Sequence, residues 1–259
     1  MHCFSVILRA ELFSLFISPA TYVSAFYFLA LLGIGFRFFL EGFASTNWIL
    51  PPLSSLVLGL TFGSPALIPF LTMKSFSEER KLGTLETLLA APVDIWGLVC
   101  GKWCACFVIY LLIVLGAFSY PLAVVVFFPE QATSLGFLNI EQWIGGFAFL
   151  MMTGASFTAI GIFSSSVTKN QMVAGMLTFS ILTMLLASMT LSLGDTPDNA
   201  NISNPFEFFM TCLGSIANGM SKIEFFVVGI IDVSTILHQA LLATLFLTLT
   251  VIQVENLNR

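Results

Sequence analysis

Long runs of apolar residues alternate with short polar segments along this chain, and the lengths of the runs predict its secondary structure. Each of six runs lacks Asp, Glu and Lys and reaches about 20 residues, the length that a helix needs to cross a bilayer. Backbone groups in lipid must be hydrogen-bonded within the segment, so the pattern predicts an all-α polytopic membrane protein, with residues 1–259 as a single transmembrane domain. The predicted membrane-spanning helices are 20–40, 54–73, 103–128, 142–167, 171–193 and 233–254.

The positions of the basic residues predict how these six helices are oriented. Cytoplasmic loops retain Lys and Arg, and six crossings place both termini on one side of the membrane. The other side holds Arg37 and Lys222 and is otherwise acidic. We therefore expect cytoplasmic N- and C-termini. Seven of the nine basic residues fall on that side: Arg9, Lys74, Arg80, Lys81, Lys102, Lys169 and Arg259.

Three segments outside the runs complete the predicted organisation. Residues 1–19 hold a helix-compatible stretch that ends at Ser18-Pro19, because proline interrupts a helix, and we expect this stretch to lie in the membrane interface. Residues 74–102 form the longest cytoplasmic segment. The outer segment 194–232 is broken by prolines, glycines and charged residues, which predicts short re-entrant or interfacial helices instead of a seventh crossing.

Composition and charge narrow the classes of function. Of the 259 residues, 58% are hydrophobic and 9% are charged, whereas soluble domains carry about 25% charged residues. The mean hydropathy is +0.98. The formal net charge of -5 provides no basic surface for phosphate backbones. A soluble enzyme, a disordered chain and a nucleic-acid-binding protein are therefore poor interpretations, and the lipid bilayer is the expected surrounding.

The segment between the second and third runs predicts a short amphipathic helix. Good helix formers fill residues 78–90, and Pro92 ends them. Leucines recur at steps of three and four residues on one side, at Leu82, Leu85, Leu88 and Leu89. Two interpretations stay open. The helix either rests on lipid headgroups, or it docks its apolar ridge into a groove of a cytoplasmic partner, where Gly83 permits close backbone approach.

The same residues resemble a known family. The run Glu78-Glu79-Arg80-Lys81-x-Gly83-Thr84-x-Glu86-x-Leu88-Leu89-x-x-Pro92 is similar to the coupling-helix signature of the type-2 family of ABC transporter permeases. The preceding Pro69-x-Leu71-Thr72-Met73-Lys74 resembles the branch that includes the gliding-motility permeases and the permease of nitrous-oxide reductase maturation. Less specific likenesses lie at Arg9-x-Glu11, Ser164-Ser165-x-x-Thr168-x-Asn170-Gln171 and Gly229-x-Ile231-Asp232.

The resemblance implies the membrane subunit of an ATP-driven exporter in the bacterial inner membrane. Its implied partners are cytoplasmic ABC ATPase subunits, a second permease copy or a homologous permease, and an auxiliary membrane or periplasmic subunit. The chain has no Gly-x-x-x-x-Gly-Lys-Ser/Thr run that would hold a nucleotide, so we expect neither enzyme activity nor a cofactor in the chain itself. The implied ATPase-coupling residues are Glu78, Glu79, Arg80, Lys81, Gly83, Thr84, Glu86, Leu88, Leu89 and Pro92.

Two rival functions stay open beside the exporter. A non-transporting membrane scaffold would use the same docking helix to recruit a cytoplasmic protein. An ion-coupled carrier would respond to a proton gradient without any ATPase. The hydrophobic interior favours lipid-like, polymeric or protein-associated cargo over a small ion.

Asp232 and His238 are candidates for a function at the outer side. Ionisable residues inside membrane helices are costly and often functional. Anchoring at the membrane interface is the simpler interpretation for both, and for Arg37 and Glu41. The related permeases tend to carry an Arg-Asp pair and a Tyr after the position of Asp232, whereas this chain has Ser234-Thr235 and His238 there.

Two groups of small side chains are assigned to packing. Cys100, Cys104 and Cys106 cluster near the start of the third run, where packing or acylation fits better than a metal site, because no nearby His completes a tetrahedral set. We expect small residues to let the fourth and fifth helices approach closely, namely Gly154, Gly161, Gly175, Ala155, Ala159 and Ala174.

Overall fold

The computed structural model describes residues 2–46, 52–85, 94–135, 137, 139–192 and 233–257. Within these residues all regular structure is helical, so the all-α expectation is confirmed for the described part of the chain. Three shorter helices are α1 (His2–Ile17), α4 (Ser77–Leu82) and α7 (Pro129–Ser134). The long helices are α2 (Pro19–Thr46), α3 (Pro52–Thr72), α6 (Ile95–Phe127), α8 (Ile140–Val167), α9 (Gln171–Ser192) and α12 (Val233–Leu257).

Five helical segments of the described chain are long and apolar enough to cross a membrane. α9 is also apolar, but its stretch Gln171–Ala187 is shorter than those five segments. The helices turn many large apolar side chains outward, among them Phe26 and Phe38 on α2. Such exposure is ordinary where lipid is the solvent. The five segments are Pro19–Gly42, Leu53–Leu82, Ile95–Phe127, Ile140–Val167 and Val233–Leu257.

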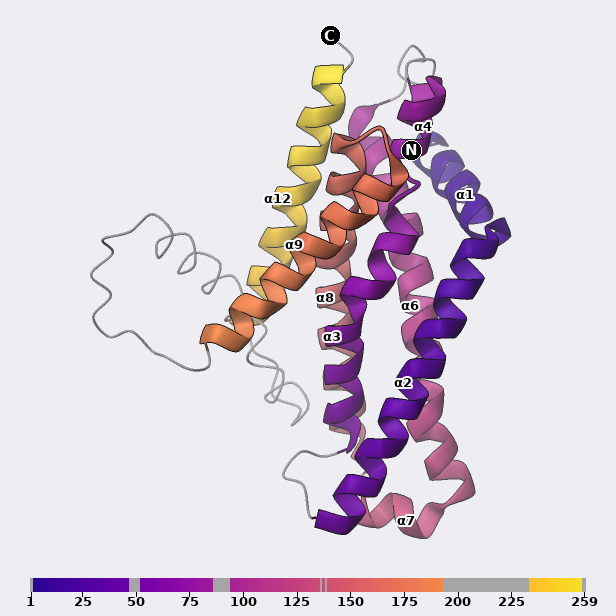
Figure 1. Ribbon diagram of the computed structural model, residues 1–259, viewed down its shortest axis with the longest axis vertical. Coiled ribbons are helices and arrows are strands. Elements are labelled where there is room, and N and C mark those ends of the chain that lie inside the picture. Colours follow the sequence, from indigo (N-terminus) through magenta and orange to yellow (C-terminus); the bar gives the residue numbers. More distant parts are fainter. Residues whose placement is uncertain are drawn as a thin grey trace, which may run out of the picture.

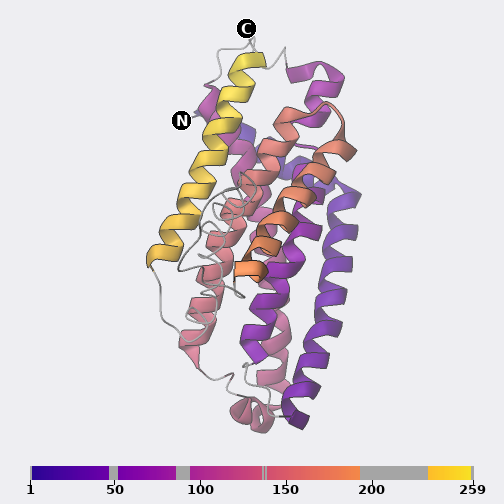
Figure 2. The ribbon, with the colours of Figure 1, turned by 60° about the vertical axis from the view of Figure 1, so that its left-hand side comes forward.

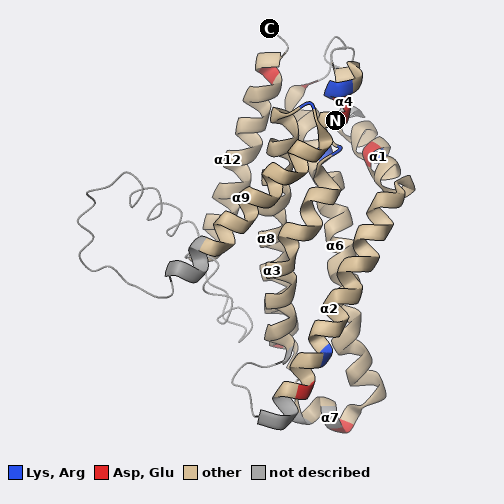
Figure 3. Cartoon of the chain, viewed as in Figure 1, with Lys and Arg blue, Asp and Glu red and all other residues tan. Residues whose placement is uncertain are grey.

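The long helices run side by side as a bundle (Figure 1). α1, α4 and the last turn of α12 lie at one end of the bundle, and α7 lies at the opposite end. α12 packs mainly on α8, along which it runs in both ribbon views (Figure 2). The charged side chains of the described residues gather toward the two ends and leave the middle of the bundle apolar (Figure 3). This distribution matches the low polarity of a membrane interior.

Two helix starts show how local sequence sets the boundaries. α1 ends at Ile17 and α2 begins at Pro19, as the Ser18-Pro19 pair predicts, because proline is tolerated in the first turn of a helix. α6 begins at Ile95, where the Asp94 carboxylate accepts a hydrogen bond from the backbone N–H of Trp96 at 3.3 Å. The first turns of α6 therefore come from the segment 74–102, which the sequence assigns to the cytoplasm.

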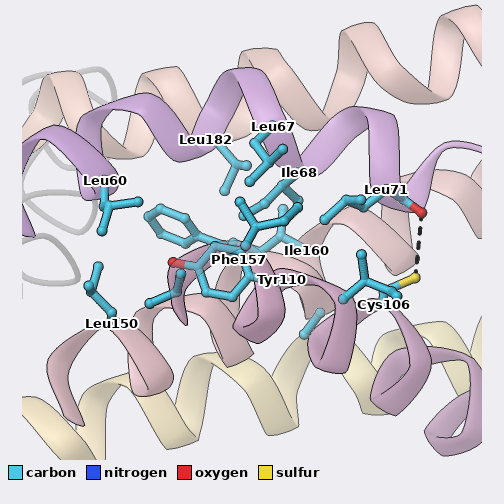
Figure 4. Close-up of a cluster of buried hydrophobic side chains, with 14 of the residues drawn as sticks. Leu60, Leu67, Ile68, Leu71, Cys106, Tyr110, Leu150, Phe157, Ile160 and Leu182 are labelled. Atoms are coloured by element: carbon cyan, nitrogen blue, oxygen red, sulfur yellow. Dashed lines mark hydrogen bonds between the residues drawn. The ribbon is translucent and has the colours of Figure 1, made fainter. Parts of the chain in front are cut away.

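The core between α3, α6 and α8 is apolar and densely filled (Figure 4). Tyr110 and Phe157 are among its largest buried side chains. Cys106 is buried too, and its Sγ donates a long hydrogen bond to the Leu71 carbonyl oxygen at 3.5 Å, whereas Cys100 and Cys104 are half-buried. Within the described residues, no group of three His, Cys, Asp or Glu is placed to hold a metal ion.

Two glycines of α8 permit close helix approach, but to other neighbours than the sequence predicts. A Cβ at Gly154 would lie under 3.0 Å from three ring atoms of Tyr110 on α6. A Cβ at Gly161 would overlap Thr72 at the end of α3, whereas one at Gly175 on α9 would meet only ordinary contacts. The expectation that these glycines bring α8 and α9 together is therefore wrong, because α8 turns its glycines toward α6 and α3.

Candidate functional site

The predicted coupling segment begins as α4 and turns at Gly83. Gly83 adopts φ 72° and ψ 6°, and its N–H donates a hydrogen bond to the Glu79 carbonyl oxygen. This left-handed C-cap favours glycine, because a side chain makes the conformation costly. The expectation of one continuous helix over 78–90 is therefore wrong at Gly83, although Thr84 and Leu85 are helical again. Apart from the two neighbouring residues, no atom of the described chain lies within 4 Å of the position of a Cβ at Gly83, so the glycine serves the turn.

The turn also separates two of the leucines that were expected to form an apolar ridge. The side chain of Leu82 is 68% exposed, whereas that of Leu85 is only 4% exposed. The expected ridge is therefore wrong for this pair. Residues 81–84 are all exposed, and we call them the α4 tip. Four predicted coupling residues lie outside the described residues: Glu86, Leu88, Leu89 and Pro92.

The N-terminus of α4 is capped by a side chain from another helix. Phe76 occupies the N-cap position and supplies no side-chain cap. Instead, the Ser165 hydroxyl of α8 accepts hydrogen bonds from the backbone N–H groups of Phe76 and Ser77, at 3.0 and 3.1 Å. The same hydroxyl lies 3.2 Å from the carbonyl oxygen of Met73, to which it donates. These contacts satisfy N–H groups that the first turn of a helix leaves unpaired.

A second contact fastens α4 to the same end of α8. The Arg80 guanidinium donates a hydrogen bond to the backbone carbonyl of Ser166, one residue before α8 ends at Val167. A cation is favourable at this place, because the carbonyl groups of the last helical turn carry partial negative charge. α4 is thus held against the C-terminal end of α8 through both its N-cap and its last turn.

Lys102 of α6 joins α4 to α1. Its side chain is only 2% exposed, and its Nζ lies 2.7 Å from Glu79 Oε1 and 3.3 Å from Glu11 Oε2. The same Nζ donates to the Ser75 carbonyl oxygen at 2.8 Å and lies 5.1 Å from the centroid of the Phe76 ring. Each of the three ammonium protons therefore has an acceptor, as a buried cation requires. We call Glu11, Ser75, Glu79 and Lys102 the Lys102 cluster.

The charged residues of α4 point in different directions. Glu79 and Arg80 are half-buried and bind the bundle, whereas Lys81 is exposed at the tip. Glu78 is half-buried as well. The sequence pattern predicts a coupling role for all four residues and does not distinguish the half-buried residues from the exposed one.

Sequence reasoning also missed Lys102 and Ser165 as members of the site. In the sequence, Lys102 serves only as one of the basic residues that indicate membrane orientation, and Ser165 only as part of a motif that resembles the family. The signal that could have identified Lys102 is its place as a lone lysine in a helix of 33 mostly apolar residues. The capping role of Ser165 depends on a contact across 88 positions of sequence and leaves no local signal.

Of the two outer-side candidates, the structure describes only His238, which has no contact with α4 or the Lys102 cluster. The His238 ring is exposed on α12, and its Nδ1 lies 3.0 Å from the Ser234 carbonyl oxygen one turn earlier. Asp232 lies outside the described residues, as does the whole predicted outer segment 194–232. Arg37 and Glu41 of α2 form an exposed ion pair of 2.9 Å within their own helix. Exposed pairs of this kind contribute little to stability.

One comparison with known proteins assigns the chain to a family. Residues 11–254 match the family model described as ABC-2 family transporter protein. The match includes the end of α1, all of α2 to α9, and most of α12. The comparison with curated proteins gives no match. Because the family model covers nearly the whole chain, this multi-pass membrane protein belongs to the ABC-2 family of transporter permeases.

Proposed function

We propose that this chain is the permease subunit of an ATP-driven ABC exporter. In this proposal a separate cytoplasmic ATPase hydrolyses ATP, and the permease converts the motion of that partner into movement of a substrate, or into mechanical work, across the membrane. The working unit contains ATPase subunits and a second permease, either another copy of this chain or a homologous protein. An auxiliary membrane or periplasmic subunit completes the assembly in the bacterial inner membrane.

The proposal includes six membrane crossings, with α9 as the fifth, and cytoplasmic termini. Support comes from the basic residues, which favour this orientation, and from the helices themselves. α1, α4 and the last turn of α12 lie at the same end of the bundle (Figure 1). If one of these three elements is cytoplasmic, the other two are cytoplasmic as well. The α4 tip then faces the compartment that contains ATP.

The observation that carries the proposal is the contrast between the base of α4 and its tip. The base is held by buried contacts with Ser165 and Lys102, whereas residues 81–84 are exposed. A short helix transmits a displacement only if its attachment does not yield, since packed helices move relative to one another as rigid bodies. In the proposed mechanism the tip and residues 86–92 contact the ATPase, and Glu79 and Arg80 pass the motion to α6 and α8.

Reconstitution tests the proposal against its two rivals. The exporter interpretation predicts that the chain copurifies with an ABC ATPase, and that vesicles containing both proteins move the copurifying cargo only when ATP is supplied. A scaffold would bind its partner without any ATP-dependent movement of cargo. An ion-coupled carrier would move cargo in response to a proton gradient in vesicles that lack the ATPase. Either of the last two results overturns the proposal.

A further inference from the structure

We propose that Lys102 is a positioning residue that locks α1 to α4, so that α1 is a second element through which motion of α4 reaches the membrane helices. This inference rests on the proposed function for the origin of the motion. The lock itself is a property of the chain alone. The contacts of Lys102, the seating of α1 on α6 and the direct passage from α1 into α2 carry the argument.

The Lys102 ammonium has acceptors from separate parts of the chain. Glu11 belongs to α1, Glu79 belongs to α4, and Ser75 belongs to the turn between α3 and α4. A lysine buried to this degree loses its hydration, and only well-placed acceptors compensate for that loss. Moving α1 away from α4 would take one acceptor from an ammonium whose side chain is only 2% exposed. The charge therefore opposes separation of the two helices.

Lys102 is the cation that pairs with both carboxylates of the cluster. Glu11 and Glu79 together carry two negative charges against the single positive charge of Lys102. Without the ammonium, two carboxylates would face each other in a poorly solvated place and repel. Glu79 Oε2 is buried without a hydrogen-bond partner among the described residues, so its carboxylate depends on the Lys102 contact through Oε1.

α1 is held on the bundle at two further places. A Cβ at Gly101 would lie 3.0 Å from Ile7 Cγ2 and 3.7 Å from the backbone nitrogen of Leu8, so the glycine lets α1 lie close against α6. At the other end of α1, Lys74 Nζ donates a hydrogen bond to the Ser18 hydroxyl at 3.3 Å. α1 is therefore seated along its length and does not rely on the ion cluster alone.

The connection to α2 gives the lock its mechanical consequence. Only Ser18 separates the end of α1 from the start of α2 at Pro19. α2 is also the least enclosed of the five candidate spans, with 11% of its apolar window buried. Tilting α2 therefore disrupts less buried apolar surface than tilting any of the other four spans. Motion of α4 thus has one route through α8 and another through Lys102 and α1 into α2.

Spin-label distances between α1 and α4 test the lock. Genetically encoded labels replace Val6 and Leu82, which are 66% and 68% exposed, and they leave the five native cysteines in place. Labelled chain is diluted with unlabelled chain, so that only distances within one chain are measured. We expect one narrow distance peak in the full-length chain, and the same peak in its complex with the ATPase before and after ATP and vanadate are added. A peak that shifts between the two nucleotide states would overturn the proposal.

Glu11→Gln removes the negative charge that α1 contributes to the Lys102 cluster, while Lys102 keeps its bonds to Glu79 and to the Ser75 carbonyl oxygen. We expect the narrow peak to broaden in this variant, because the attraction that opposes separation of α1 from α4 is weakened although the contacts at Gly101 and Ser18 remain. The matched control is Glu130→Gln on α7, which removes a carboxylate at the opposite end of the bundle and keeps the narrow peak. A narrow peak in Glu11→Gln would overturn the proposal.

A double substitution tests whether Glu11 acts through Lys102. Lys102→Met also loses the narrow peak, and adding Glu11→Gln to it produces no further broadening if both residues belong to one unit. Further broadening in the double variant would contradict the assignment. Circular dichroism of each variant shows whether it has kept its helices, and Glu11→Gln alone decides the outcome if Lys102→Met does not fold.

The two proposals fail in different ways. If the exporter function is wrong, nucleotide does not shift the broadened distances of Glu11→Gln, yet this variant still loses the narrow peak in the isolated chain. If the lock is wrong, the isolated chain gives the same peak with Glu11 or with Gln at this position.

Discussion

The hydroxyl of Ser165 lies 3.1 Å from the backbone nitrogen of Ser77, across the contact between α8 and α4. α4 has only six residues, and isolated helices shorter than about 12 residues are marginal in water. The first turn of α4 therefore depends on a neighbouring helix for its cap. The same contact therefore supports both the position of α4 and the folding of its first turn.

Replacing Ser165 by alanine should destabilise α4. The change removes the acceptor of two backbone N–H groups, in a buried place where an unpaired donor costs about 1–3 kcal/mol. We expect a lower melting temperature in detergent and faster proteolysis at the α4 tip. Ser164→Ala is the matched control, because its hydroxyl donates to the Ile160 carbonyl within α8 itself. Equal effects of the two substitutions would contradict the capping role.

Gly83→Ala should weaken the end of α4 without filling any space. The left-handed conformation at φ 72° costs a residue with a Cβ about 1–2 kcal/mol. Asparagine adopts this conformation more readily than alanine, so Gly83→Asn should have the smaller effect. The measurement is ATP hydrolysis by the reconstituted complex relative to the free ATPase, together with hydrogen exchange of α4. Identical behaviour of the Ala and Asn variants would mean that backbone conformation is not what Gly83 provides.

Gly154→Ala should destabilise the bundle, whereas Gly175→Ala should be tolerated. The first substitution drives a methyl group into the Tyr110 ring, and overpacking of this kind costs about 1–3 kcal/mol. The second places a methyl group 3.8 Å from the nearest atom, Met73 Sδ. Thermal unfolding of the two variants in the same detergent checks this order. A larger loss for Gly175→Ala would contradict the packing described for α8.

Loss of the hydroxyl should change stability differently at the two tyrosines of α6, Tyr110 and Tyr120. The Tyr110 hydroxyl is buried and has no hydrogen-bond partner among the described residues. Tyr110→Phe should therefore leave stability unchanged or raise it. The Tyr120 hydroxyl donates to the Leu29 carbonyl oxygen at 2.8 Å, and Tyr120→Phe should cost about 1 kcal/mol. Melting temperatures in detergent make the comparison, and a greater loss for Tyr110→Phe would reverse the assignment.

Much of the helical framework can be predicted from the sequence, because membrane helices follow directly from apolar runs. The break at Ser18-Pro19 is equally local, since proline carries the signal itself. The start of α6 at Ile95 is harder to predict, because Asp94 acts as a cap only when its own backbone is extended, as it is here at φ -68° and ψ 123°. The apolar run predicts the part of this helix that spans lipid, not the turns that extend beyond it.

The site itself depends on contacts between distant residues. Lys102 meets Glu11 across 91 positions of sequence and Glu79 across 23. No periodicity in the chain records such a contact. The sequence predicts close backbone approach at Gly83. It does not predict the turn there, because the residues on both sides of Gly83 are good helix formers. The family resemblance predicts a coupling role for the whole segment, and it does not separate the residues that hold α4 from those that are exposed.

The central claim is that the α4 tip contacts a cytoplasmic ATPase. A photo-crosslinking residue in place of Lys81, which is exposed at the tip, tests it most directly in intact cells. The control is the same residue at Glu130 on α7, at the opposite end of the bundle. The account predicts an adduct with the ATPase from position 81 and none from position 130. Adducts from position 81 with phospholipid alone, or modification of this position by a membrane-impermeant reagent from outside the cell, would contradict it.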